Sequence, residues 1–147
     1  MADESVFPAR TARELTDSIC SGTHTAREIT EKALAHIQQT NPAINAFITI
    51  DEEGALKAAD TVDQKVKSGD NLGPLAGVPI ALKDVLCTKG LRTTCASKIL
   101  ENFIPPYNAT TVSHLHRADA IILGKLNMDE FAMGSSTENS AFFATHN

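Results

Sequence analysis

The sequence has 147 residues, about the size of one small domain. Hydrophobic residues make up 42% and charged residues 21%, so the chain can bury a core, which argues against wholesale disorder. The net charge is −5 and there is no run of Lys and Arg, which argues against a surface that binds nucleic-acid phosphates. If RNA takes part in the function, we expect a partner to hold it.

The cysteines and the chain start indicate the compartment. Cys20, Cys87 and Cys95 are odd in number and form no CxxC pair, so we expect a reducing compartment and three small, buried, apolar residues. Residues 1–10 are acidic and polar and lack the regions of a secretory signal. The apolar runs are too short to span a bilayer. These features predict a cytoplasmic protein outside the membrane.

Two helices are predicted first. Apolar residues at helical spacing predict a helix over 9–21, which Gly22 ends. Thr25 then opens a second helix through a capping box with Glu28. Asn41-Pro42 is expected to end it, because proline cannot continue the helical hydrogen bonds.

A strand and a third helix follow. The run 46–50 is rich in residues that favour strands. The acidic residues 51–53 suit the positive end of a helix, which carries an apolar stripe and stops near Ser68-Gly69.

The second half of the chain has a different pattern. Residues 77–82 predict a loop that leads into a buried strand ending at Lys83, and 120–123 predict a second buried strand after a helix over 110–117. Helices that alternate with apolar strands indicate an α/β fold. Two strands joined by a crossover would leave open edges, so we expect the sheet to be incomplete.

Lys83 is the main candidate for chemistry. It can be a solvated residue at a strand end, paired with Asp84, and position alone favours this interpretation. Alternatively it is a partly desolvated lysine whose pKa is lowered, which can then act as a general base. Its position cannot decide between the two.

The surrounding segments resemble a known family. Residues 77–84 (GVPIALKD) are followed in order by 93–98 (TTCASK), 105–110 (PPYNAT) and 123–140 (LGKLNMDEFAMGSSTENS). Together they resemble the amidase-signature family, and within it the glutamine-hydrolysing A subunits of tRNA-dependent amidotransferases more closely than general amidases. Several long segments in the right order are more specific than one short motif.

The resemblance implies a Ser-cisSer-Lys triad. The neutral lysine takes a proton from a serine on a cis peptide bond, which takes one from the nucleophilic serine. That serine attacks the side-chain amide of glutamine and releases ammonia, while backbone amides stabilise the oxyanion. Of the triad only the catalytic lysine, Lys83, is matched, because the Gly/Ser-rich region with both serines would follow 144–147. The chain is therefore expected to be the N-terminal portion of its family's domain and inactive alone.

Other residues are assigned by the same resemblance. Met133, Gly134 and Ser135 are expected to line the substrate pocket, although simple loop packing is an equal alternative. Ser135 and Ser136 belong to a different motif from the triad serines and do not replace them. Asp119 stands where the family commonly has glycine between helix and strand, which suggests mild strain.

Two short patterns are rejected as sites. Gly124-Lys125 is not a phosphate-binding loop, since Asp119 and Leu126 occupy required positions. His114 and His116 are two apart on a predicted helix and point to different faces, so no metal is expected.

The family implies a fold, partners and cofactors for the chain. The expected fold is α/β: N-terminal helices, then the start of a mixed β-sheet flanked by helices. Residues 1–70 would be mainly helical and 71–147 would begin the core of a single amidase domain. The implied partners are the B and C subunits of the amidotransferase, glutamine, and Glu-tRNA(Gln) held mainly by the B subunit; ATP and magnesium are expected on the partner, with no cofactor here. The alternatives are another amidase-signature amide hydrolase and a non-catalytic interaction module.

Overall fold

The computed structural model describes residues 11–147. Within them the helices are α1 (Ala12–Cys20), α2 (Ala26–Ile44), α3 (Glu52–Ser68) and α4 (Thr110–Arg117), with short 3-10 turns η2 (Lys98–Leu100) and η3 (Glu130–Ala132). The strands are β1 (Phe47–Ile50), β2 (Pro79–Lys83) and β3 (Ile121–Leu126). The predicted mixed α/β class is confirmed. The predicted helix start at 9–10 and the interpretation of residues 1–10 as lacking a signal lie outside the described residues.

The sheet is built around β3, in the order β1-β3-β2. β1 pairs with β3 antiparallel, with Ile50 opposite Gly124, and β2 pairs with β3 parallel, with Lys83 opposite Leu126. The prediction that this strand ends at residue 123 was therefore wrong. β3 continues because both of its edges have a hydrogen-bonding partner, which the local sequence does not reveal.

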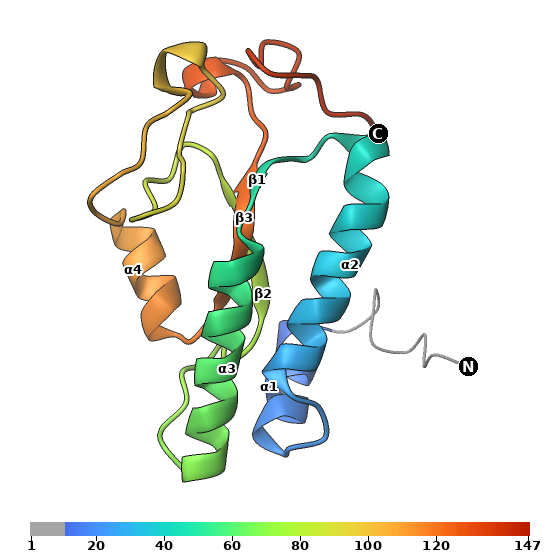
Figure 1. The fold of residues 1–147 in the computed structure, drawn as a ribbon, viewed down its shortest axis with the longest axis vertical. Coiled ribbons are helices and arrows are strands. Elements are labelled where there is room, and N and C mark those ends of the chain that lie inside the picture. Colours follow the sequence, from blue (N-terminus) through green and yellow to red (C-terminus); the bar gives the residue numbers. More distant parts are fainter. Residues whose placement is uncertain (1–10) are drawn as a thin grey trace.

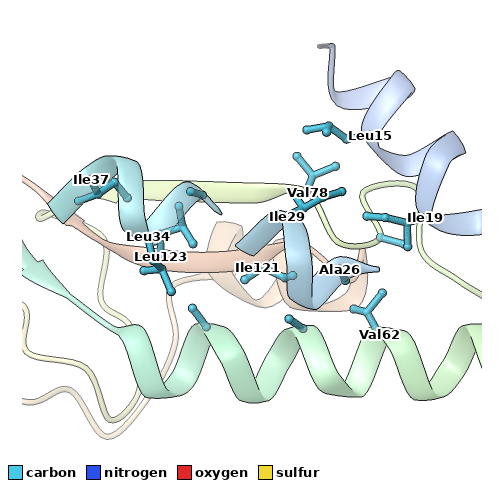
Figure 2. Close-up of a cluster of buried hydrophobic side chains, with 14 residues drawn as sticks. Leu15, Ile19, Ala26, Ile29, Leu34, Ile37, Val62, Val78, Ile121 and Leu123 are labelled. Atoms are coloured by element: carbon cyan, nitrogen blue, oxygen red, sulfur yellow. The ribbon is translucent and has the colours of Figure 1, made fainter. Parts of the chain in front are cut away.

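The helices cover both faces of the sheet (Figure 1), with α1, α2 and α3 on one side and α4 on the other. Figure 2 shows the larger core, in which Ile121 and Leu123 of β3 contact side chains from α1, α2 and α3. On the opposite face, Val112 of α4 packs against Leu82 and Ile122. This burial of apolar surface from both sides fixes the sheet. None of the helices between residues 11 and 147 has the length and apolar character needed to cross a bilayer.

The N-terminus of α2 is capped twice. Thr25 and Glu28 form the predicted capping box, with hydrogen bonds of 3.0 and 2.9 Å, so this prediction is confirmed. In addition, the carboxylate of Asp63 on α3 accepts from the N–H groups of Ala26 at 2.7 Å and Arg27 at 3.0 Å. A side chain of one helix thus satisfies amides at the start of another and fixes how α2 and α3 pack.

The C-terminus of α2 differs from the prediction. The helix continues through Pro42 to Ile44, so the expected end at Asn41-Pro42 was wrong. Proline removes one N–H from the last turn, and the turn closes instead at Asn45, which is left-handed (φ 58°) and donates its N–H to Asn41 at 2.7 Å.

All three cysteines are free thiols, but none is buried. Cys20 is exposed, and Cys87 and Cys95 are half-buried, so the expectation of three buried cysteines was wrong. Cys20 is the last residue of the short helix α1, where the apolar stripe has already ended.

Asp119, between α4 and β3, is left-handed with φ 59°, as the comparison with glycine suggested. Its carboxylate accepts from Lys65 Nζ at 2.7 Å and from the Gly73 N–H at 2.8 Å. The Asp119 side chain is 11% exposed and that of Lys65 is 35% exposed. These contacts connect α3, the 73–77 turn and the start of β3, and they offset the strain of the backbone.

We expect Asp119→Ala to lower the free energy of unfolding by about 1.5–3 kcal/mol, because it loses both charge-assisted hydrogen bonds. Asp119→Gly should lose about 1 kcal/mol less, because glycine adopts the left-handed conformation without strain. Urea denaturation followed by circular dichroism measures both. Asp17→Ala, an exposed change on α1, is the control. An alanine variant as stable as the wild type would show that the carboxylate contributes nothing.

Candidate active site

Lys83 lies at the carboxyl end of β2, the edge of a parallel pair where ligands commonly bind in α/β proteins. Its carbonyl accepts from the Leu86 N–H at 3.0 Å, so it is the first residue of a tight turn. Lys83 is exposed. Residues 11–147 therefore leave this amine accessible and do not supply the desolvation that a lysine base requires.

Asp84 turns inward, in contrast to Lys83, and is fully buried. Its Oδ2 accepts from the Thr94 N–H at 2.9 Å and from the Thr94 hydroxyl. The pair with Lys83 considered from the sequence is replaced by an ion pair with Lys125, because neighbouring side chains at a strand end point in opposite directions.

Lys125 is the charged partner of Asp84 and is also completely buried. Its Nζ donates to the Leu86 carbonyl at 2.9 Å and to the Thr93 hydroxyl at 2.8 Å, and lies 3.2 Å from Asp84 Oδ1. The ammonium group thus makes two hydrogen bonds and one ion-pair contact within the protein. Burial lowers the pKa of Lys125, and the nearby Asp84 carboxylate opposes that change.

Asp84 Oδ1 depends entirely on this ion pair among the described residues. It accepts no hydrogen bond from any of them, although it is inaccessible to solvent. A buried carboxylate oxygen without a donor is costly, so the Lys125 ammonium is its compensating charge.

An irregularity in the sheet directs Lys125 to this position. Between Ile80 and Ala81 the partner on β3 advances by two residues, from Ile122 to Gly124, which marks a bulge. A bulge inserts one residue, so the side chains beyond it no longer follow the simple alternation. Gly124 (φ 153°) is required here, because a Cβ would collide with the carbonyl oxygen of Thr49 on β1.

Sequence reasoning missed both buried residues as a structural unit. Lys125 was considered only as part of a rejected phosphate-binding motif. Gly124 inside an apolar strand was the available signal, since such a glycine often marks a bulge or a close backbone approach.

Two loops with strained backbone meet beside this pair. Cys95 and Ala96 have φ of 52° and 53°, and Phe131 and Ala132 have φ of 52° and 61°. The loops are joined by a hydrogen bond from the Phe131 N–H to the Cys95 carbonyl at 2.9 Å. Left-handed residues other than glycine cost about 1–3 kcal/mol each and cluster at functional sites. Their grouping here favours the carboxyl edge of the sheet as the functional region.

The second of these loops is organised by Asp129. This residue is 3% exposed, and its carboxylate accepts from the N–H groups of Ser136, Thr137 and Asn139 at 2.9–3.0 Å. These backbone hydrogen bonds lower the pKa of Asp129. Gly134 is needed beside it, because a Cβ there would lie 2.6 Å from the Asp129 carboxyl carbon.

The predicted substrate-binding residues lie on this loop. Met133, Gly134 and Ser135 are exposed, with Met133 72% exposed. β3 leaves the sheet opposite Lys83, so the loop follows at the same edge, where Figure 1 shows the segments after β3 gathered. No hydrogen bond or ion pair among residues 11–147 joins Lys83 to these three, so the structure places them at one edge without a polar link between them.

A lysine that acts as a base needs both a desolvated site and an amine that a substrate can reach, and here the two properties belong to different lysines, Lys125 and Lys83. Lys125 is buried, but its ammonium group is held by two hydrogen bonds and an ion pair, and solvent does not reach it. Lys83 has the accessible amine at the sheet edge. Only Lys83 can meet a substrate, so it is the better candidate for proton transfer once desolvated.

Comparison with known proteins identifies the family. The family model described as Amidase matches residues 28–147. The chain belongs to the amidase family. This confirms the resemblance derived from the segments around Lys83 and from 123–140.

A curated relative from Acidothermus cellulolyticus, the A subunit of glutamyl-tRNA(Gln) amidotransferase, is 56% identical over 138 residues. The match covers 94% of this chain and 27% of the relative. This amidase chain therefore spans little more than a quarter of the length of that relative.

Two solved structures resemble the chain in fold. A vestigial protein complex, described in connection with the origins of an s-triazine catabolic enzyme, contains a chain with TM-score 0.90 and 40% identity, over 94% of this chain and 30% of that one. The A subunit of glutamyl-tRNA(Gln) amidotransferase from Thermotoga maritima has TM-score 0.67 and 38% identity, over 83% of this chain and 24% of that one.

Asp129 gives a pH-dependent prediction. Because its pKa is lowered in the folded state, its stabilising contribution is present above the ordinary aspartate pKa of about 3.9 and is lost as the pH falls through the lower folded value. We expect Asp129→Asn to reduce stability near neutral pH, with a difference from wild type that shrinks below about pH 4. Urea denaturation across pH measures this.

Glu130→Gln is the control for this experiment, because it removes a neighbouring carboxylate while leaving the three amide contacts. A deficit of Asp129→Asn that stays constant down to the acid limit would show that the carboxylate charge does not organise the loop.

Proposed function

We propose that this chain is the lysine-bearing part of the glutamine-hydrolysing subunit of a glutamyl-tRNA(Gln) amidotransferase. The observation that carries the proposal is Lys83, exposed at the carboxyl end of β2 on the edge shared with the 129–140 loop. The 56% identity to a curated A subunit supports the choice within the amidase family.

In the proposed reaction Lys83 is the terminal base of a Ser-cisSer-Lys triad whose serines lie outside these 147 residues. The neutral amine accepts a proton from the first serine, which accepts one from the nucleophile. The nucleophile attacks the side-chain amide carbon of glutamine, the relay returns its proton to the leaving nitrogen, and the C–N bond breaks to release ammonia and leave an acyl-enzyme. Water then hydrolyses the acyl-enzyme to glutamate and the free serine. On the partner subunit ATP would activate the side-chain carboxylate of Glu-tRNA(Gln) by phosphorylation, and the ammonia would displace phosphate to give Gln-tRNA(Gln).

Because Lys83 is exposed in residues 11–147, further protein must cover it to favour the neutral form. Met133, Gly134 and Ser135 are proposed to form one wall of the glutamine pocket. Met133 is suited to this role by its large exposed apolar surface on a loop fixed by Asp129.

The proposed partners are the B and C subunits of the amidotransferase. The net charge of −5 supports binding of Glu-tRNA(Gln) mainly by the B subunit, since acidic residues outnumber Lys and Arg in this sequence and phosphate binding needs clustered basic residues. ATP and magnesium would likewise belong to that partner. The free thiols support a reducing, cytoplasmic location.

A second candidate function is hydrolysis of another amide. It is supported by the TM-score of 0.83, at 30% identity, with 6-aminohexanoate cyclic dimer hydrolase, compared with 0.67 for the Thermotoga maritima protein. Ammonia release from glutamine by a form of this chain extended through the serine region separates the two candidates. Release from other amides but not from glutamine would support the second.

The chain of 147 residues should release no ammonia from glutamine, because it contains the base without the two serines. A coupled glutamate dehydrogenase assay measures this. Turnover that disappears in Lys83→Met would overturn the proposed triad.

In the extended form assembled with the B and C subunits, Lys83→Met should reduce glutaminase kcat by about 10⁴-fold or more, as expected for loss of a triad member. Lys89→Met, an exposed lysine in the loop after β2, is the matched control and should retain activity. Near-normal turnover in Lys83→Met would remove Lys83 from the mechanism.

A further inference from the structure

The turn that begins at Lys83 is held by a side chain from the neighbouring strand. Lys83 is its first residue, Asp84 and Val85 are central, and Leu86 closes it through the 3.0 Å hydrogen bond to the Lys83 carbonyl. Val85 is exposed, so apolar packing of the central residues does not fix this turn. Its conformation therefore depends on polar contacts from the neighbouring strand β3.

Lys125 supplies these contacts. It binds the Leu86 carbonyl and the Asp84 carboxylate, so it holds two of the three residues that follow Lys83. Its third contact, to the Thr93 hydroxyl, connects the turn to the loop that Asp84 also reaches through Thr94. Since Lys125 and Asp84 are both 0% exposed, water cannot substitute for either partner.

The strand geometry makes this support rigid. Lys125 lies in the central strand β3, with Leu82 opposite it on β2 and Thr49 opposite it on β1. The Asp84 N–H donates to the Leu126 carbonyl at 3.1 Å, which continues the ladder past the end of β2. The backbone of residues 84–86 is thus held by β3 through both its main chain and the Lys125 side chain.

We propose that Lys125, paired with Asp84, is a positioning residue for Lys83: it fixes the 83–86 turn so that the Lys83 amine is presented at the sheet edge. This inference rests on the proposed function for its catalytic consequence. Lys125 does not touch substrate, because it is enclosed and its donors are used within the protein.

A pair of single variants and their double variant separates positioning from stability. Lys125→Met leaves the buried Asp84 carboxylate without its counter-charge, and Asp84→Asn does the same to the Lys125 ammonium group. Each single variant should therefore lower the melting temperature of the chain. Lys125→Met/Asp84→Asn removes both charges together and should recover much of that loss. The double variant therefore tests the turn in a folded protein.

The first readout is amide hydrogen exchange in the 147-residue chain, which needs no activity. In the double variant the Leu86 amide should exchange about tenfold or more faster, while the Ile121 amide in β3 keeps its wild-type protection. Lys98→Met/Glu101→Gln removes an exposed ion pair of the same chemistry and should change neither amide. Unchanged protection of Leu86 in a folded double variant would overturn the inference.

The second readout is glutaminase kinetics in the extended form with the B and C subunits. The double variant should lose about 100-fold in kcat with KM for glutamine nearly unchanged, because a misplaced base slows chemistry without weakening substrate binding. Wild-type kcat in a variant whose Leu86 amide has lost protection would overturn the positioning role.

These readouts also separate the inference from the proposed function. If the wild-type extended form releases no ammonia from glutamine, the proposed function fails, and the exchange of Leu86 still decides whether Lys125 fixes the turn. If the wild type is active and Leu86 stays protected in the double variant, the inference fails and the proposed function stands.

Discussion

The buried ion pair between Lys125 and Asp84 is the interaction on which the edge of the sheet depends. An unpaired charge in this environment would be destabilising by about 3–5 kcal/mol, so each residue requires the other. The pair also determines what surrounds it, since every remaining donor of Lys125 and one oxygen of Asp84 must find partners in nearby loops. The strained backbone at Cys95 and Ala96 is tolerated there because these contacts over-determine the loop.

The different roles of Lys125 and Lys83 follow from the same buried ion pair. A lysine that is enclosed and held by two hydrogen bonds and an ion pair can serve as a fixed charge but not as an acid or base that exchanges protons with a ligand. Lys83 is next to the pair in sequence yet points outward, because side chains alternate at the strand end. In the proposed arrangement the buried Lys125 thus fixes the position of the exposed Lys83. Desolvation of the Lys83 amine must come from further protein that covers this edge of the sheet.

Much of the fold could be predicted, because helices and strands leave periodic patterns in the sequence. The capping box at Thr25 and the strand before Lys83 are local signals, and both are present in the structure, although this strand is mostly half-buried and not buried as predicted. The full length of β3 could not be predicted, because it is set by pairing with β1, more than 70 residues earlier in the chain. The candidate base was recognisable from the segments around it, but the Lys125–Asp84 pair was not, since a bulge redirects the lysine and periodicity assumes a regular strand. The role of Asp129 depends on amides seven to ten residues further on, which no local rule connects to it.

The placement of β3 between β1 and β2 has a consequence for synthesis on the ribosome. The helices α1 to α3 come early in the chain and can pack on one another as they emerge, because their contacts are close in sequence. β1 and β2 have no partner in the described sheet until residues 121–126 appear. Both strands therefore stay unpaired while about 40 further residues are translated after β2. During this time their backbone N–H and C=O groups are exposed to other chains. Pairing with β3 ends this exposure, and the same strand brings in Lys125, whose side chain contacts the turn that begins at Lys83.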